Sequence, residues 1–205
     1  LKVLSELCST QTALVCVMMA NNEVGTVQDL DAVSTICRAS NIPLMSDCVQ
    51  SAMWLPIDVN ALGLDMVAIS GHKMGGPQGV GALWVRRCSA LRGLRPRQFG
   101  GGQERGLRAG TLPIPLVVGL GAACELASER LRHDAVRVSK LRDALWRLIS
   151  QAIPDATQNG ALDSRLPNNL NLTLPGIQAE ALLRSVPGLA AVSYTHLRAH
   201  ETLSY

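Results

Sequence analysis

The residues best suited to chemistry in this 205-residue chain are Ser70-Gly71-His72-Lys73. They follow the apolar run Asp65–Ile69 and precede a Gly-Gly-Pro sequence, a pattern typical of a buried strand that leads into a tight loop. In open α/β folds, ligands bind at the carboxyl ends of such strands. There the Lys73 amine can form a Schiff base with a carbonyl cofactor, while Ser70 and His72 hold the phosphate of that cofactor. The alternative is that Lys73 is an ordinary solvated lysine on a loop.

Two further apolar runs also end in polar side chains. Asn22 follows the run 13–20, and Asp47 and Gln50 follow the run that begins at Leu44, so that about 25 residues separate successive groups. Pyridoxal phosphate requires a carboxylate that keeps its pyridine nitrogen protonated, and a carboxamide near its phenolic oxygen tunes its reactivity. Taken alone, Asp47 would be interpreted as a cap or turn residue. Together with the lysine, these groups indicate a pyridoxal phosphate site.

The elements that must position these groups alternate along the chain. The pattern predicts strands over 13–20, 44–50, 65–69 and 79–86, the first of them buried on both faces, and a helix over 28–40 with one apolar stripe. This order predicts a mainly parallel sheet covered by helices. Farther along, we expect one helix from Pro113 to Ala127, a charged stretch at 128–132 and a second amphipathic helix that ends before Pro154.

The last part of the chain has a different pattern. Residues 155–165 are predicted to form a polar loop, and the alternation of polar and apolar residues over 169–174 predicts a half-buried antiparallel strand. A short helix over 178–185 and the beginning of another strand at 189–193 follow. This order predicts the start of a smaller α+β domain.

Composition narrows the class of protein. The chain is 47% hydrophobic and 17% charged, which is enough apolar material for a sizeable core. A net charge of +3 is too small to indicate nucleic acid or an anionic membrane as a partner. The six cysteines include no C-x-x-C pair, which favours reduced thiols and a cytoplasmic location over a disulfide framework. No apolar stretch is long enough to span a bilayer.

Four motifs in order resemble those of the cysteine desulfurases, which are class V aminotransferase-like enzymes of the pyridoxal phosphate fold type I. The motifs are Asn21–Gly25, Asp47–Ser51, Ser70–Lys73 and Gly100–Thr111. The resemblance covers roughly residues 10–193. It implies an α/β fold in which residues 1–130 belong to the large cofactor-binding domain and 131–193 to the small C-terminal domain.

The resemblance also implies a role for each matching residue around the ring of the cofactor. Lys73 would be the catalytic lysine that carries pyridoxal phosphate between turnovers. Asp47 would pair with the pyridinium nitrogen, and Gln50, with Asn22 nearby, would bond the phenolic oxygen and the substrate.

The phosphate of the cofactor would be held by a second group of residues. Ser70 and His72 would bind it from within the same chain. Thr111 would reach the phosphate of the neighbouring subunit, which implies a homodimer. His196 and His200 have the spacing of a metal pair on a helix, but we expect no metal site.

The activity that the resemblance implies is conversion of L-cysteine to L-alanine, with the sulfur passed on as an enzyme persulfide to an acceptor protein. Iron–sulfur cluster assembly and thio-cofactor synthesis are both compatible with the family, and the sequence does not distinguish them. Other enzymes of this class would use the same lysine and aspartate, namely a selenocysteine lyase, a sulfinate desulfinase or an aminotransferase. A non-catalytic scaffold that retains the fold is the alternative outside enzymes, and the presence of Lys73, Asp47 and His72 argues against it.

The resemblance stops at the last residues of the chain. In the family, a mobile loop with the catalytic cysteine follows a strand like 191–193, whereas residues 194–205 contain no cysteine. Both tyrosines and two of the four histidines lie in these residues, which resemble a non-native cloning tail. We therefore expect a fragment that lacks the N-terminal part and the nucleophile loop and has little or no activity by itself.

Overall fold

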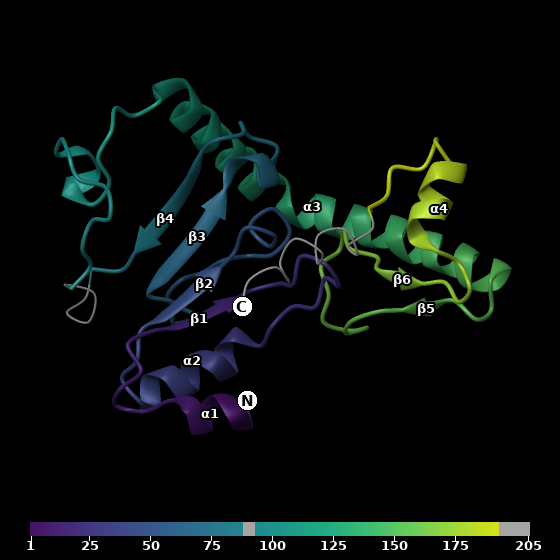
Figure 1. The fold of residues 1–205 in the computed structure, drawn as a ribbon, viewed down its shortest axis with the longest axis horizontal. Coiled ribbons are helices and arrows are strands. Elements are labelled where there is room, and N and C mark those ends of the chain that lie inside the picture. Colours follow the sequence, from purple (N-terminus) through teal and green to yellow (C-terminus); the bar gives the residue numbers. More distant parts are fainter. Residues whose placement is uncertain (88–92, 193–205) are drawn as a thin grey trace.

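The protein is described by a computed structural model that covers residues 1–87 and 93–192 (Figure 1). A four-stranded sheet forms its centre, with the strands in the order β1 (Val15–Met18), β2 (Leu44–Asp47), β3 (Met66–Ser70) and β4 (Gly81–Val85). The β1–β2 and β2–β3 pairs are parallel, and the β3–β4 pair is antiparallel. The sheet is therefore mainly parallel, as predicted, with a hairpin-like return at β4.

The main core lies between this sheet and α2 (Leu30–Ala39), next to which lies α1 (Lys2–Leu7) (Figure 1). The helix α2 begins where the Asp29 carboxylate accepts a hydrogen bond of 3.0 Å from the Ala32 amide. Its apolar stripe is buried as the spacing predicts, with Leu30, Val33 and Cys37 all in the core. Burial of this face fixes α2 against one side of the sheet.

The helix α3 (Ile114–Ala152) is one continuous element of 39 residues, so the prediction of two helices with a charged break is wrong. The predicted break over 128–132 contains neither glycine nor proline, and its charged side chains extend into solvent without interrupting the backbone ladder. The first part of α3 packs against Met74, in the turn after β3, and against Ile69 and Val80 nearby. The second part extends away from the sheet toward β5, β6 and α4 (Figure 1).

The strand β1 is buried on one face only, so the prediction that both faces are buried is wrong. Val15 and Met19 point into the core with α2, whereas Leu14 and Met18 are 39% and 37% exposed. Side chains alternate between the two faces of a strand, and the described residues cover only one face of this edge strand.

The region after α3 forms a small antiparallel pair, β5 (Thr157–Gln158) with β6 (Leu172–Thr173), followed by α4 (Ala179–Ser185). The predicted short helix over 178–185 is therefore confirmed. The strand predicted over 169–174 is reduced to Leu172–Thr173, which pairs with Thr157–Gln158. Residues 189–192 form no strand, and the predicted tail lies outside the described residues. None of the helices in the described part has both the length and the apolar character of a bilayer-spanning segment.

Candidate functional site

Three parallel strands end at the same edge of the sheet. The register pairs Met18 of β1 with Asp47 of β2, and Asp47 with Ala68 of β3, so β1 and β2 end level while β3 continues to Ser70 at the same edge. Asp47 is the last residue of β2, and Asn22 lies in the turn that follows β1. The topology thus brings together polar residues that are separated along the chain.

The segment after β3 carries the lysine. Ser70 ends the strand, and Gly71–Met74 form a single 3₁₀ turn, labelled η1, from which His72 and Lys73 are exposed. The Ser70 hydroxyl and His72 Nδ1 share a hydrogen bond of 2.9 Å. Gly75 closes the turn with a φ of 75°, a left-handed conformation that favours glycine. The hydroxyl, the imidazole and the amine are therefore presented to solvent at one strand end.

The turn that carries Lys73 packs against the helix α3. Met74 is buried and packs with Leu120 and Ala123 of α3. A Cβ at Gly76 would lie 2.9 Å from the Cβ of Ala123, and a Cβ at Gly119 would lie 2.5 Å from Cγ of the Pro77 ring. At Gly76 and Gly119, the segment after the lysine turn is therefore packed against α3 with no room for an extra methyl group.

The end of β2 separates a half-buried carboxylate from a buried thiol. The Asp47 carboxylate accepts a hydrogen bond of 2.9 Å from the Val49 amide, and Gln50 lies half-buried in the same turn. Cys48 is fully buried, with its sulfur 3.8 Å from that of Met19. Burial raises the pKa of the Cys48 thiol, and hydrogen bonds from neighbouring serine side chains offset this only in part. Cys48 is thus a core residue.

The turn after β1 is stabilised by hydrogen bonds among its own residues and by hydrogen bonds from residues 169 and 171. The Asn21 carboxamide oxygen accepts hydrogen bonds of 2.9 Å from the Glu23 and Val24 amides. From outside, Asn169 and Asn171 donate to the Glu23 carbonyl oxygen at 2.9 and 3.1 Å. The alternation over 169–174 predicts only that both asparagines lie on the polar face of a strand. Their two-residue spacing was the available signal, because it places two carboxamides on the same side.

Thr111 is not brought to this edge. It is exposed and lies between the 3₁₀ turn η3 (Gln103–Gly106) and α3, in a segment that Figure 1 draws on the β4 side of the sheet. No hydrogen bond within the described residues joins it to the strand ends. Its predicted contact is with a second subunit, so this role stays a prediction.

The donor set at the edge fits pyridoxal phosphate in its chemistry. An exposed amine suits the aldehyde, a carboxylate suits the ring nitrogen, carboxamides suit the phenolic oxygen, and a hydroxyl–imidazole pair suits the phosphate. These groups reach the edge from the ends of β1, β2 and β3 and from the turns directly after them. The fit therefore follows from the topology and does not require a rearrangement of the sheet.

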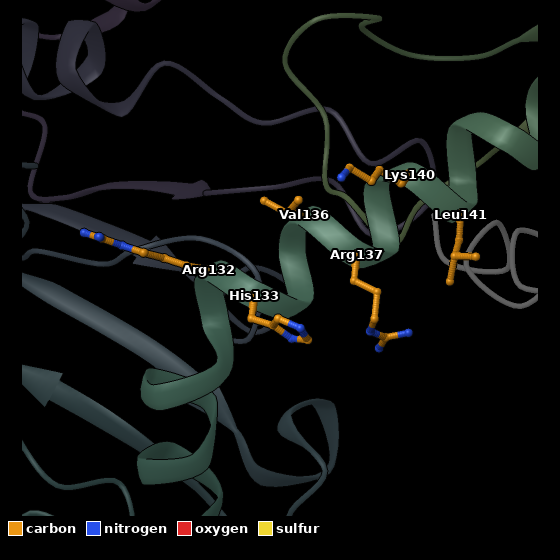
Figure 2. Close-up of a pocket in the computed structure, with 6 residues that line it drawn as sticks. All are labelled: Arg132, His133, Val136, Arg137, Lys140 and Leu141. Carbon is orange, nitrogen blue, oxygen red and sulfur yellow. The ribbon is translucent and has the colours of Figure 1, made fainter.

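A hollow on the surface of α3 is lined by other residues (Figure 2). The side chains that line it are Arg132, His133, Val136, Arg137, Lys140 and Leu141. All six belong to α3, so no second element supplies an opposing wall. None of them is a predicted site residue, and we do not consider this hollow to be the functional site.

Comparison with known proteins gives a consistent result. A family model described as "Aminotransferase class-V" matches residues 1–188. A "Probable cysteine desulfurase, mitochondrial" from Dictyostelium discoideum is 43% identical over 193 residues, which are 94% of this chain and 43% of that protein. A "Cysteine desulfurase IscS" from Shewanella oneidensis is 44% identical over 182 residues, 89% of this chain and 45% of that protein.

Solved structures resemble the chain as well. A "NifS-like protein" superimposes with a TM-score of 0.82 at 36% identity, covering 91% of this chain and 50% of the other. DndA from Streptomyces lividans gives a TM-score of 0.78 at 37% identity over 89% of this chain and 51% of its own. These likenesses confirm the predicted α/β fold, a mainly parallel sheet flanked by helices. The chain spans less than half the length of the curated relatives it matches.

Proposed function

Given that the chain belongs to the aminotransferase class-V family, we propose that the protein of which it forms part is a pyridoxal phosphate-dependent cysteine desulfurase. The observation that carries the proposal is the exposed Lys73, which follows β3 beside the Ser70–His72 pair and at the same sheet edge as Asp47. The names of its relatives, cysteine desulfurases at 41–44% identity, agree with this reaction.

Each residue at the edge has a task in this reaction. Pyridoxal phosphate, when bound, supplies an electron-accepting ring that weakens the bonds at the substrate α-carbon. Lys73 would hold the cofactor through its amine, and with that amine released it could accept or return a proton at Nζ. Asp47 keeps the ring nitrogen protonated, and Gln50 and Asn22 orient the phenolic oxygen and the substrate.

The remaining groups bind rather than react. Ser70 and His72 hold the phosphate from within the subunit, and Thr111 would do so across a homodimer. The substrate is L-cysteine, which is converted to L-alanine while its sulfur passes as a persulfide to an acceptor protein. Since none of the chain's cysteines matches the family's nucleophile position, we expect the 205-residue chain itself to have little or no activity. A cytoplasmic location is part of the same proposal.

The domain division is also proposed. Residues 1–130 would form part of the large cofactor-binding domain, residues 131–193 part of the small domain, and residues 194–205 a non-native tail. The helix α3 would then cross the boundary without a break. Proteolysis of the full-length protein with identification of the released fragments tests this division.

The test of the function uses the three lysines of the chain, Lys2, Lys73 and Lys140. The full-length protein is mixed with pyridoxal phosphate, reduced with borohydride and mapped by mass spectrometry. We expect a pyridoxyl group on Lys73 and none on the exposed Lys140, and a Lys73→Ala variant that is unlabelled and inactive, beside an active Lys140→Ala control. Label spread over all three lysines, or absent from Lys73, would reject the proposed cofactor site.

The substrate class requires a second assay. Alanine release from L-cysteine, L-selenocysteine and cysteine sulfinate is measured side by side with the full-length protein. Release from cysteine with a persulfide on the enzyme supports a desulfurase, whereas release from selenocysteine alone indicates a selenocysteine lyase. A Lys73→Ala variant that fully supports the protein's cellular role would indicate a scaffold instead.

A further inference from the structure

Residues 159–171, which lie beyond α3, fold back onto the turn that follows β1. The Leu166 amide donates to the Gly25 carbonyl at 2.8 Å, and the Val27 amide donates to the Ser164 carbonyl at 2.9 Å. The Ala161 amide also donates to the Thr26 hydroxyl at 3.0 Å. Hydrogen bonds thus join two segments that are more than a hundred residues apart in the sequence.

The centre of this contact is the Glu23 carbonyl oxygen, one residue after Asn22. It accepts a hydrogen bond of 2.9 Å from Asn169 Nδ2 and another of 3.1 Å from Asn171 Nδ2. A Cβ added at Gly25 would lie 2.6 Å from side-chain atoms of Asn169, so the turn and the carboxamide are in close contact. The Glu23–Val24 peptide, one residue beyond Asn22, is therefore fixed by two donors and by packing.

The orientation of the Asn171 carboxamide is itself determined by a neighbour. Asn159 Nδ2 donates to Asn171 Oδ1 at 2.8 Å and to the Thr173 hydroxyl at 2.9 Å. Because the oxygen of Asn171 is occupied in this way, its NH₂ group faces Glu23.

The environment of the Asn169 side chain also indicates that its contact with Glu23 matters. Its Oδ1 is buried and has no hydrogen-bond partner within the described residues. An unmade buried hydrogen bond destabilises the folded state, so the side chain stays buried at a cost. The contact that it does make is the bond from Nδ2 to the Glu23 carbonyl.

We propose that Asn169 and Asn171 are positioning residues, which hold the Glu23 carbonyl so that the Asn22 carboxamide faces the cofactor and substrate. The inference rests on the proposed function, because it assumes that Asn22 contacts the phenolic oxygen or the substrate. It adds that residues of the segment after α3 determine the geometry of a site to which they do not belong.

The test compares isosteric variants of the full-length protein. Asn171→Asp keeps the oxygen that accepts from Asn159 but removes the donor to Glu23 and sets a carboxylate against a carbonyl oxygen. Asn169→Asp does the same for the second donor. Thr173→Val is the matched control, because it removes a hydroxyl that bonds Asn159 without touching the turn after β1.

Three readouts separate positioning from general destabilisation. Amide exchange over 21–27 reports on the turn itself, and it requires no cofactor. The pH titration of the bound cofactor's absorption band reports on the groups near its phenolic oxygen. The ratio of kcat to KM effects reports on substrate orientation.

For either Asp variant, we expect roughly tenfold faster exchange over 21–27, because each loses a hydrogen bond to the Glu23 carbonyl and sets a carboxylate against that carbonyl oxygen. We also expect a shifted cofactor titration and a change in KM that exceeds that of the control. Unaltered exchange, or faster exchange with an unshifted titration and the KM of the control, would overturn the inference. Failure of the unmodified protein to take up pyridoxal phosphate would reject the proposed function. Uptake by the unmodified protein together with unaltered variants would reject only the positioning role, so the two failures are distinguishable.

Discussion

At the residue scale, the sheet edge separates groups that face solvent from groups that are kept out of it. Lys73 and His72 are exposed on η1, whereas Cys48, next to Asp47, is fully buried. The same neighbourhood therefore contains an accessible amine and an inaccessible thiol. This difference supports a cofactor-binding role for the lysine and a packing role for the cysteine.

The cysteine environments predict an order of reactivity. In the folded 205-residue chain at pH 8, we expect iodoacetamide to alkylate the exposed Cys16 at least about tenfold faster than Cys37 or Cys48. Burial raises the pKa of both Cys37 and Cys48, so a smaller fraction of each is thiolate at this pH, and access is also restricted. Mass mapping over time measures the rates, and urea should equalise them. Equal rates without urea would contradict the described burial.

Replacing Arg86 by alanine should destabilise the fold, whereas the same replacement of its neighbour Arg87 should not. Its guanidinium donates to the Leu64 and Val59 carbonyls and to the Asn60 side chain at 2.8–3.0 Å, which ties the connector before β3 to the end of β4. Arg86→Ala should therefore lower the free energy of unfolding by about 2–3 kcal/mol.

The matched control for this variant is Arg87→Ala, since Arg87 is exposed. A change within about 0.5 kcal/mol is expected there. Urea denaturation measures both variants, and equal losses would mean that these hydrogen bonds are not the cause.

At the element scale, α3 matters because its first part supports the turn that carries the lysine. Two of its glycines have different surroundings: Gly119 lies against the Pro77 ring, while a Cβ at Gly121 would meet nothing within 4 Å. Gly121→Ala should raise the free energy of unfolding by about 0.8–1 kcal/mol through helix propensity.

The substitution Gly119→Ala should have the opposite sign. Overpacking against Pro77 is expected to cost about 1–3 kcal/mol and to weaken pyridoxal phosphate binding by the full-length protein. Thermal unfolding and a cofactor titration measure the two effects. Stabilisation by both alanines would show that α3 and the Pro77 segment are not in tight contact.

The sequence predicted elements well where the signal was local. The strand ends at Asp47 and Ser70 were predictable, because short apolar runs stop there in polar residues. The break in α3 was predicted wrongly, because charge alone does not interrupt a helix. The bonds from Asn169 and Asn171 to Glu23 were not predictable, since they join residues that no local pattern connects.

At the scale of the whole molecule, the described residues leave an apolar stripe uncovered on the second part of α3. Leu141, Leu145 and Leu148 are 59%, 49% and 61% exposed, and their spacing puts them on one side of the helix. An exposed apolar surface of this kind promotes association.

We therefore expect the isolated 205-residue chain to self-associate in a concentration-dependent manner. Replacing Leu141, Leu145 and Leu148 together by glutamine should lower the association measured by sedimentation velocity. The control replaces Arg130 and Arg137, which are also exposed on α3, by glutamine. Equal association of both variants would mean that the leucine stripe on α3 is not the surface through which the chain associates.

The bonds from Asn169 and Asn171 to the Glu23 carbonyl span 146 and 148 residues of sequence. A ribosome makes the strand ends early, but it must synthesise residue 171 before the turn after β1 can acquire both donors. Contacts between such distant residues also form slowly, since a long stretch of chain must be closed. Cofactor loading is therefore expected to follow translation of the segment beyond α3, and a nascent chain arrested before it would contain the lysine without the finished site.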